Sequence, residues 1–281
     1  MPPTTDRRPL LTIRNLTVEF PTKGHGTLRA VDGADLEIGL GEVHGLVGES
    51  GSGKTVLALS ILRLVDPPGR VTHGEILWQE TNLLVIPERE IIQVRGQDIA
   101  MVFQNAPGSL NPALRIQKQL VGLLRYRRGM SKAEARYEAS RLIGAVHLQE
   151  PERVLSSYPH ELSGGMAQRV AIAMALACKP RLLIADEPTT ALDVRVAAQL
   201  LDLLRELRES FGLSILLISH DLGVIARLCD SVSVIHAGQI IERGDAEEVL
   251  SMPTHPYTKA LLEAALVLAP LQKTGLPSMS R

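Results

Sequence analysis

A glycine-rich segment in the first quarter of the chain combines the residue types that bind phosphate. Residues 48–55 read Gly-Glu-Ser-Gly-Ser-Gly-Lys-Thr and match the pattern G-x-x-x-x-G-K-[ST]. Backbone N–H groups of such a loop point inward, and the start of the following helix adds partial positive charge. We expect Lys54 to reach the β- and γ-phosphates of a nucleotide and Thr55 to ligate Mg²⁺. The predicted phosphate-binding residues are Gly48, Glu49, Ser50, Gly51, Ser52, Gly53, Lys54 and Thr55.

Two acidic residues end a second apolar segment, residues 181–187, which reads Arg-Leu-Leu-Ile-Ala-Asp-Glu. A strand buried on both faces has no use for carboxylates at its tip unless a cation lies there. Asp186 suits an outer-shell partner of Mg²⁺, and Glu187 suits a group that polarises the water attacking a γ-phosphate. Acids at a strand end also cap following helices, so this pattern alone is moderate evidence for a cation site. It becomes strong evidence when combined with the phosphate loop. Together the two segments predict nucleotide hydrolysis.

Several short apolar runs supply the strands that would position these groups. They lie at 42–47, 181–185, 213–218 and 231–235, and segments of helical periodicity such as 194–209 and 221–228 separate them. Strands buried on both faces and separated by helices predict a parallel sheet in an α/β chain. Before them, Leu11–Phe20 alternates as a half-buried strand does.

The character of the chain changes between about residues 105 and 165. Ser131-Lys-Ala-Glu134 has the spacing of a capping box, and the segments after it are charged and helical in period. This stretch is therefore predicted to be a helical insertion into the α/β chain.

Composition narrows the class of protein. Lys and Arg number 30 against 31 Asp and Glu, a formal net charge of −1, which argues against nucleic-acid binding through a strongly basic surface. No apolar run approaches the roughly 20 residues that span a bilayer. The two cysteines, Cys178 and Cys229, lack metal-ligand spacing and are expected to be buried thiols in a reducing compartment. We therefore expect a soluble protein that meets a membrane only through a partner.

A third motif points to a family. Residues 161–168, Glu-Leu-Ser-Gly-Gly-Met-Ala-Gln, resemble the LSGGQ signature of ABC (ATP-binding cassette) ATPases. An isolated Ser-Gly-Gly is more often a flexible turn, but this one precedes a helical run and lies roughly twenty residues before the acidic strand, as in ABC cassettes. Met166 and Ala167 depart from the usual signature beside the Ser-Gly-Gly contact. The resemblance implies that Ser163, Gly164 and Gly165 contact the nucleotide of a partner cassette.

Four further residues fall in the order that the resemblance implies. Gln104 resembles the glutamine that contacts Mg²⁺ and the attacking water, and His220 resembles the histidine that contacts the γ-phosphate. Asp193 closes Ala191-Leu-Asp, which resembles the segment called the D-loop. Phe20 is the candidate for the aromatic that stacks on adenine, although it is nearly as well explained as a core residue of the first strand. The implied catalytic residues are Lys54, Gln104, Glu187 and His220, and the implied metal ligands are Thr55, Gln104 and Asp186.

The resemblance covers roughly residues 10–265 and implies an α/β fold, a P-loop NTPase cassette of the ABC type. It should have a mostly parallel core sheet, an N-terminal antiparallel β subdomain and a helical subdomain at about 105–165, followed by a tail at 266–281. The implied cofactors are ATP and Mg²⁺. The implied partners are a second cassette and transmembrane permease subunits, and a paralogous cassette is favoured over an identical copy. An extracytoplasmic solute-binding protein would be an indirect partner. No nucleic acid is expected to bind. The chain would lie peripherally on the cytoplasmic face of the membrane.

Several shorter segments of the sequence resemble one branch of the ABC importers. Ser109-Leu-Asn-Pro112 and His255-Pro-Tyr-Thr258, among others, look like the oligopeptide, dipeptide and nickel importers. The expected function is therefore ATP hydrolysis that powers an importer, with oligopeptides or dipeptides as the first choice and nickel or another small solute as the alternative. A non-transport ABC ATPase is disfavoured because only about 110 residues separate Lys54 from Ser163, without sustained heptads. A catalytically dead cassette is disfavoured by the intact Lys54, Glu187 and His220.

Overall fold

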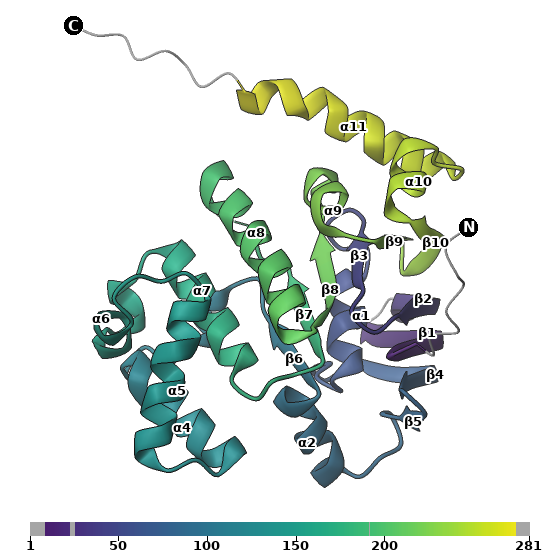
Figure 1. The fold of residues 1–281 in the computed structure, drawn as a ribbon. Helices are drawn as coiled ribbons and strands as arrows, with labels where there is room; N and C mark the ends of the chain where they lie inside the picture. Colours follow the sequence, from purple (N-terminus) through teal and green to yellow (C-terminus); the bar gives the residue numbers. More distant parts are fainter. Residues whose placement is uncertain (1–8, 23–25, 191, 274–281) are drawn as a thin grey trace, which may run out of the picture.

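The computed structural model describes residues 9–22, 26–190 and 192–273. Figure 1 shows three parts side by side: helices α4–α7, a central sheet flanked by helices, and an antiparallel sheet of β1, β2 and β4. This arrangement confirms the predicted α/β class with a helical insertion and a separate antiparallel part.

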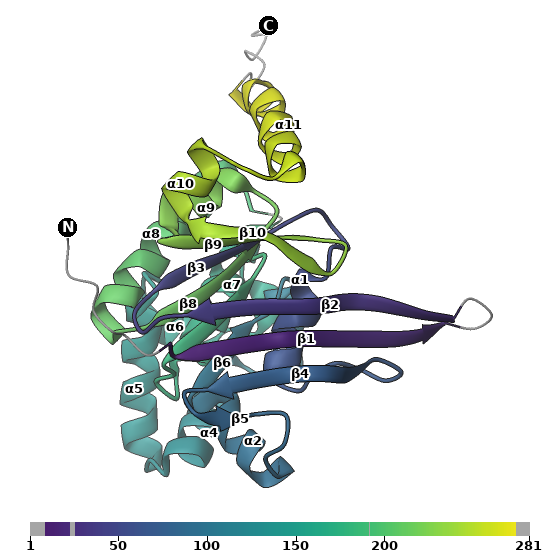
Figure 2. The ribbon, with the colours of Figure 1, turned by 90° about the vertical axis from the view of Figure 1, so that its right-hand side faces the viewer.

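The antiparallel sheet has the strand order β2-β1-β4-β5. Its strands are β1 (Leu11–Thr22), β2 (Gly26–Ile38), β4 (Arg70–Trp78) and β5 (Thr81–Asn82). The pairing of Leu11 with Ile38 at one end of the ladder continues to Thr22 and Gly26 at the other, so the β1–β2 hairpin projects from the body (Figure 2). Residues 26–29 of β2 are exposed and show no apolar pattern. This part of the strand is therefore defined by its pairing with β1.

The central sheet has the strand order β10-β9-β3-β8-β7-β6. All neighbouring pairs from β9 to β6 are parallel, and only β10 runs antiparallel to its neighbour β9. The mostly parallel core is thus confirmed. Its strands are β3 (Val43–Val47), β6 (Ile99–Val102), β7 (Leu182–Asp186), β8 (Ser214–Ser219), β9 (Ser231–His236) and β10 (Gln239–Asp245).

Alternate side chains of the central strands enter two different cores. In β8, Ile215 and Leu217 join the cluster that includes α7 and α8, whereas Leu216 and Ile218 join the cluster that includes β1, β2 and α1 (Lys54–Ile61). The period of two along a strand explains why both kinds of residue must be apolar. One face of the sheet is thereby covered by the antiparallel sheet and α1, and the other by helices.

The helical subdomain follows β6 and ends in the helix that enters the main body. Its elements are α3 (Ala106–Ser109), α4 (Ile116–Arg128), α5 (Lys132–Ala145), α6 (Pro151–Ser156), a short 3₁₀ turn (Pro159–Glu161) and α7 (Gly164–Leu176). The capping box predicted at the start of α5 is present, because Ser131 Oγ accepts from Glu134 N at 3.3 Å and Ser131 N donates to Glu134 Oε2 at 2.8 Å.

The last helix of the described chain extends past residue 265. Helix α11 spans Pro256–Lys273 and crosses the expected domain boundary at 265/266 without a break (Figure 1). The apolar residues Leu261, Leu262 and Ala265 pack against the core, so helix formation there has tertiary support. The remaining helices are α2 (Glu88–Gln97), α8 (Val194–Phe211), α9 (Leu222–Leu228) and α10 (Ala246–Ser251).

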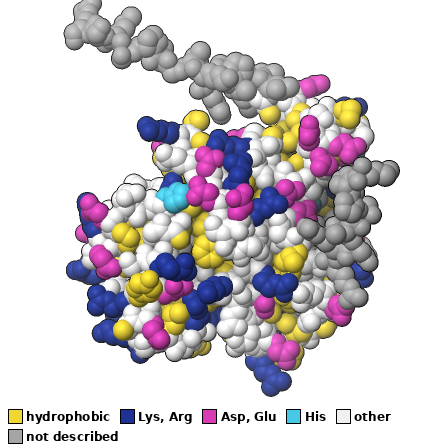
Figure 3. Space-filling view, in the orientation of Figure 1, with side chains coloured by type: hydrophobic (Ala, Val, Ile, Leu, Met, Phe, Trp, Pro, Cys, Tyr) yellow, Lys and Arg dark blue, Asp and Glu magenta, His cyan; other side chains and the backbone are white. Residues whose placement is uncertain are grey.

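No helix among the residues described is both long and apolar enough to cross a bilayer. Cys178 and Cys229 are free thiols, and burial raises the pKa of each. On the face seen in Figure 3, Lys and Arg side chains are interspersed with Asp and Glu side chains.

The two-sided burial of β8 predicts a strong dependence of stability on its apolar residues. Leu216→Ala should lower the free energy of unfolding by about 2–5 kcal/mol, because it leaves a cavity between the two sheets. Leu28→Ala is the matched control, because Leu28 is 58% exposed whereas Leu216 is 0% exposed. The Leu28 variant should lower the free energy of unfolding by less than about 0.5 kcal/mol. Denaturant unfolding of both variants measures the difference, and equal midpoints would contradict the assigned burial.

Candidate functional site

The predicted site residues converge because the strands before them are parallel and adjacent. Strand β8 lies between β3 and β7, so the segments that follow these three strands leave the sheet at the same edge. The phosphate loop follows β3, Glu187 follows β7 and His220 follows β8. Gln104 follows β6, beyond β7 at the same edge. The topology thus brings four separate parts of the sequence to one place.

The phosphate loop depends on glycine at defined positions. Gly51 and Gly53 have positive φ values of 81° and 107°, which L-residues with a Cβ rarely adopt. A Cβ on Gly53 would also overlap the carbonyl oxygen of Ala30 in β2, and one on Gly48 would overlap that of Ile235 in β9. The loop therefore packs its backbone directly against two neighbouring strands.

Lys54 folds back over the loop that precedes it. Its Nζ donates to the carbonyl oxygens of Gly48 at 2.8 Å and Glu49 at 2.7 Å, and the residue is 6% exposed. Burial lowers the pKa of Lys54, and the nearby carboxylates of Glu187 and Asp186 oppose this shift. The ammonium group is thus held in a sparsely solvated position next to two acids.

Thr55 and Asp186 form a pair of oxygen ligands suited to a hard cation. Thr55 Oγ1 donates to Asp186 Oδ1 at 3.2 Å, and Asp186 is 2% exposed. Burial raises the pKa of Asp186, and the charge of Glu187 adds to this effect. A divalent cation would offset both the burial of the Asp186 carboxylate and its repulsion from Glu187. A hydroxyl and a carboxylate are oxygen ligands of the kind that Mg²⁺ accepts. The residues present fit this ion.

Three residues, Ile218, Thr190 and His220, form hydrogen bonds with Glu187. Its N–H donates to Ile218 O in β8 at 3.0 Å, and its Oε2 accepts from Thr190 Oγ1 at 2.9 Å. His220 Nδ1 lies 2.9 and 2.7 Å from the two carboxylate oxygens. The Glu187 backbone has φ 49°, in the sparsely populated left-handed region, and the residue is 8% exposed. The carboxylate is therefore oriented in advance, as a proton acceptor must be.

Two other predicted residues, Gln104 and Phe20, are not joined to this cluster by the hydrogen bonds of the described residues. Gln104 is exposed and begins the segment that leads to α3. Phe20 is half-buried in β1, its ring lies against Gly69, and it packs on the core between the antiparallel sheet and α1. This packing fits the core interpretation of Phe20, and adenine stacking stays a prediction.

The signature residues open a different helix. Ser163 caps α7, its Oγ accepts from Met166 N at 3.3 Å, and both Ser163 and Gly164 are exposed. Gly165 lies against Val196 in the first turn of α8, and Asp193 caps that helix by accepting from Val196 N at 2.9 Å. Among the hydrogen bonds of the described residues, none joins Ser163 to the phosphate loop, Asp186 or Glu187.

One residue of the predicted D-loop, Ala191, lies outside the described residues, and the segment is described only through its neighbours. Thr190 comes just before it and supports Glu187, a contact that no sequence pattern indicated.

A tyrosine from the far end of the chain also touches the loop. Tyr257 Oη accepts a hydrogen bond from Glu49 N at 3.2 Å. His255-Pro-Tyr-Thr258 stood out in the sequence only as a match to a family branch, and nothing in its spacing located it beside residue 49, more than 200 positions away.

Comparisons with known proteins agree with this geometry. The family described as "ABC transporter" matches residues 31–190. The oligopeptide transport ATP-binding protein OppD of Bacillus subtilis is 45% identical over 254 residues, which cover 90% of this chain and 71% of that protein. OppD of Salmonella typhimurium is 47% identical over 255 residues, covering 91% of this chain and 76% of that protein.

Solved structures give the same result. A dimeric post-hydrolysis state of the ATP-binding cassette MJ0796, bound to ADP and Pi, is 29% identical with a TM-score of 0.75, covering 84% of this chain and 98% of that chain. CbiO1 of Clostridium perfringens, part of the transporter complex cbiONQ, is 25% identical with a TM-score of 0.74, covering 94% of this chain and 98% of that chain. Motifs, fold, family match and relatives together show that the chain belongs to the ABC transporter family.

Proposed function

We propose that this chain is the ATP-binding and hydrolysing subunit that powers an importer of oligopeptides or dipeptides. The observation that carries the ATPase role is the meeting of Lys54, Asp186, Glu187 and His220 at one edge of the parallel sheet. The choice of peptides rests on relatives: the two OppD proteins are named for oligopeptide transport, and a DppD protein of Haemophilus influenzae, 44% identical, is named for dipeptide transport.

The side chains divide the work of hydrolysis. When ATP binds, Lys54 exchanges its bonds to loop carbonyls for bonds to phosphate oxygens. Thr55 and Asp186 would hold Mg²⁺, which neutralises charge on the phosphates, and Gln104 would contact the ion and the water from the margin of the site. Glu187 accepts a proton from the attacking water. His220 keeps this carboxylate in place and faces the γ-phosphate from its exposed position.

A second cassette would complete the site. Ser163 and Gly164 are exposed at the positive end of α7, where backbone N–H groups favour an anion. In the proposed dimer, Ser163, Gly164 and Gly165 of one cassette close on the γ-phosphate bound by the other, and Asp193 lies at the same interface. The MJ0796 cassette, which is similar in fold, was solved as a dimer. We favour a related cassette over an identical copy as the partner.

The chain would sit peripherally on the cytoplasmic face of the membrane, against permease subunits that receive solute from an extracytoplasmic binding protein. The segment from Asn105 to Leu120 would contact the permease, since it follows Gln104 and opens the helical subdomain. Within it Asn111 and Gln119 brace each other, because Asn111 N donates to Gln119 Oε1 at 2.9 Å and Gln119 Nε2 donates to Asn111 O at 3.0 Å.

Glu187→Gln should lower ATP hydrolysis by about 10²-fold or more, because the amide keeps the shape but cannot accept the proton. ATP binding should persist, since Lys54 and Thr55 are unchanged. The measurement is phosphate release by the transporter complex purified from membranes, with Glu209→Gln, at an exposed acid on α8, as the matched control. Hydrolysis at the wild-type rate would remove Glu187 from its assigned role.

Ala113→Glu should reduce peptide uptake by about tenfold or more in reconstituted vesicles, while the ATPase rate of the complex in detergent stays near that of the wild type. Ala113 is exposed in the segment assigned to the permease, and its backbone N–H donates to Asn111 Oδ1 at 3.0 Å within that segment. Ala260→Glu, at an exposed position on α11, is the control. Wild-type uptake by the Ala113 variant would contradict this docking site.

A further inference from the structure

The start of α11 is attached to the central sheet beside the phosphate loop. Glu242 in β10 accepts hydrogen bonds from Thr254 N at 2.6 Å, Thr254 Oγ1 at 2.8 Å and His255 N at 3.1 Å. Burial opposes ionisation of Glu242, but hydrogen bonds from this segment outweigh it and lower its pKa to about 2. Because the pKa is lowered, this anchor is fully present above the ordinary carboxyl range and is lost only as the pH falls toward 2.

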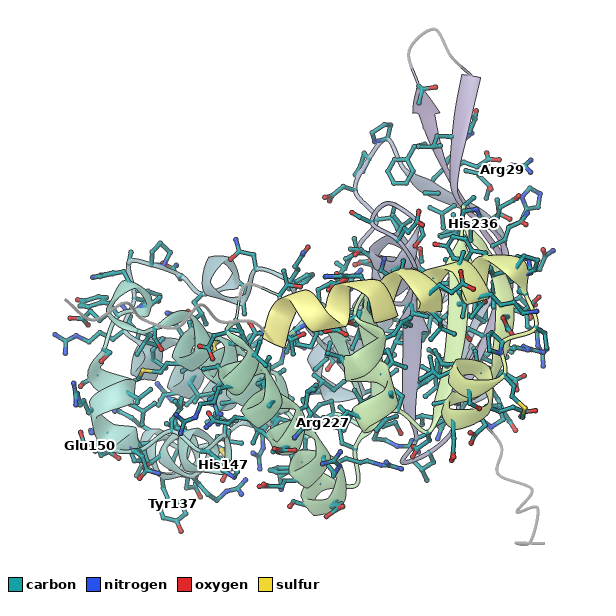
Figure 4. The ribbon with its side chains drawn as sticks, turned by 90° about the horizontal axis from the view of Figure 1, so that it is seen from above. Arg29, Tyr137, His147, Glu150, Arg227 and His236 are labelled. Carbon is teal, nitrogen blue, oxygen red and sulfur yellow. The ribbon has the colours of Figure 1, made fainter. Side chains whose placement is uncertain are left out.

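The anchored segment presents Tyr257 to the loop. The Tyr257 ring packs on His236 at the end of β9, with centroids 4.0 Å apart and planes tilted by 37°. Figure 4 shows His236 at the end of the sheet that lies under the first turns of α11. Ile235, next to His236, is the residue whose carbonyl oxygen touches Gly48. The ring is thus fixed by the same strand end on which the loop packs.

The hydroxyl of Tyr257 acts on a peptide unit that also contacts Lys54. Glu49 N–H and Gly48 C=O belong to one peptide plane. Its N–H donates to Tyr257 Oη at 3.2 Å, and its carbonyl oxygen accepts from Lys54 Nζ at 2.8 Å. Burial raises the pKa of Tyr257, so the phenol stays protonated at neutral pH. Lys54 leaves this carbonyl oxygen when it turns to phosphate, whereas the bond from Glu49 N–H to Tyr257 Oη does not involve Lys54, so the hydroxyl still holds the peptide unit.

We infer that Tyr257 is a positioning residue for ATP binding: its hydroxyl fixes the Gly48–Glu49 peptide and so preorganises the phosphate loop from the C-terminal helix. The inference rests on the proposed ATP hydrolysis, to which it adds a contact between α11 and the nucleotide site. An ordered loop binds phosphates equally in the ground and transition states. Loss of the hydroxyl should therefore raise KM for ATP while kcat is retained.

Tyr257→Phe tests this inference, since it removes the hydroxyl and keeps the ring on His236. In the complete transporter complex, KM for ATP should rise about fivefold, with kcat changed less than about twofold. Hydrogen exchange of the peptide that contains the Glu49 amide should also speed up about fivefold, while exchange in β8 stays the same. Tyr137→Phe makes the same chemical change on α5, at a side chain that is 76% exposed and lies across the molecule from His236 (Figure 4), and should change neither value.

Two outcomes overturn the inference. Unchanged KM and unchanged Glu49 exchange would mean that the hydroxyl does not order the loop. A lower kcat with unchanged KM and a lower melting temperature would mean that Tyr257 serves only overall stability. Absence of ATPase activity in the wild-type complex would instead contradict the proposed function, and the exchange measurement, which needs no ATP, would still decide the role of Tyr257.

Discussion

The structure depends on keeping one ammonium and two carboxylates in a largely buried position at the edge of a parallel sheet. Lys54 is 6%, Asp186 2% and Glu187 8% exposed. Charges so poorly solvated are costly unless they offset one another and are hydrogen-bonded. Here the offset works in both directions: the acids support the charged form of Lys54, and Lys54 supports ionised Asp186. Two carboxylates against one ammonium leave one negative charge uncompensated. This charge favours a divalent cation, which a nucleotide would bring with it.

The rest of the fold meets the geometric demands of this cluster. Its members follow β3, β7 and β8, so strand register determines their separation, and the apolar residues on both faces of these strands hold the register. Glycine at positions 48 and 53 lets the phosphate loop approach β9 and β2 more closely than any other residue would. The Tyr257 contact adds a constraint from the C-terminal helix on the same loop. A change in the strand register, in the glycines of the phosphate loop or in the Tyr257 contact should therefore shift the position of Lys54.

Sequence alone predicted the parts of this arrangement that are local. The phosphate loop, the acidic strand end and the capping box at Ser131 are contiguous motifs whose geometry follows from their own residues. Contacts between distant segments carry no such pattern: the bond of Thr190 to Glu187 and the bond of Glu49 to Tyr257 were not predicted. The full length of β2 has no such pattern either, because its exposed residues 26–29 pair with β1 without alternating apolar residues. No local motif in the sequence marked the continuation of α11 to Lys273.

Equilibrium binding of MgATP to the purified chain, wild type against Lys54→Ala, tests the central claim that this sheet edge is the nucleotide site. The variant removes the one ammonium buried among the loop carbonyls and the two acids. Bonds of a charged donor to phosphate are among the strongest in proteins, so affinity should fall by at least about tenfold. Equal affinity of the two proteins would contradict the assignment of Lys54, and with it the location of the site.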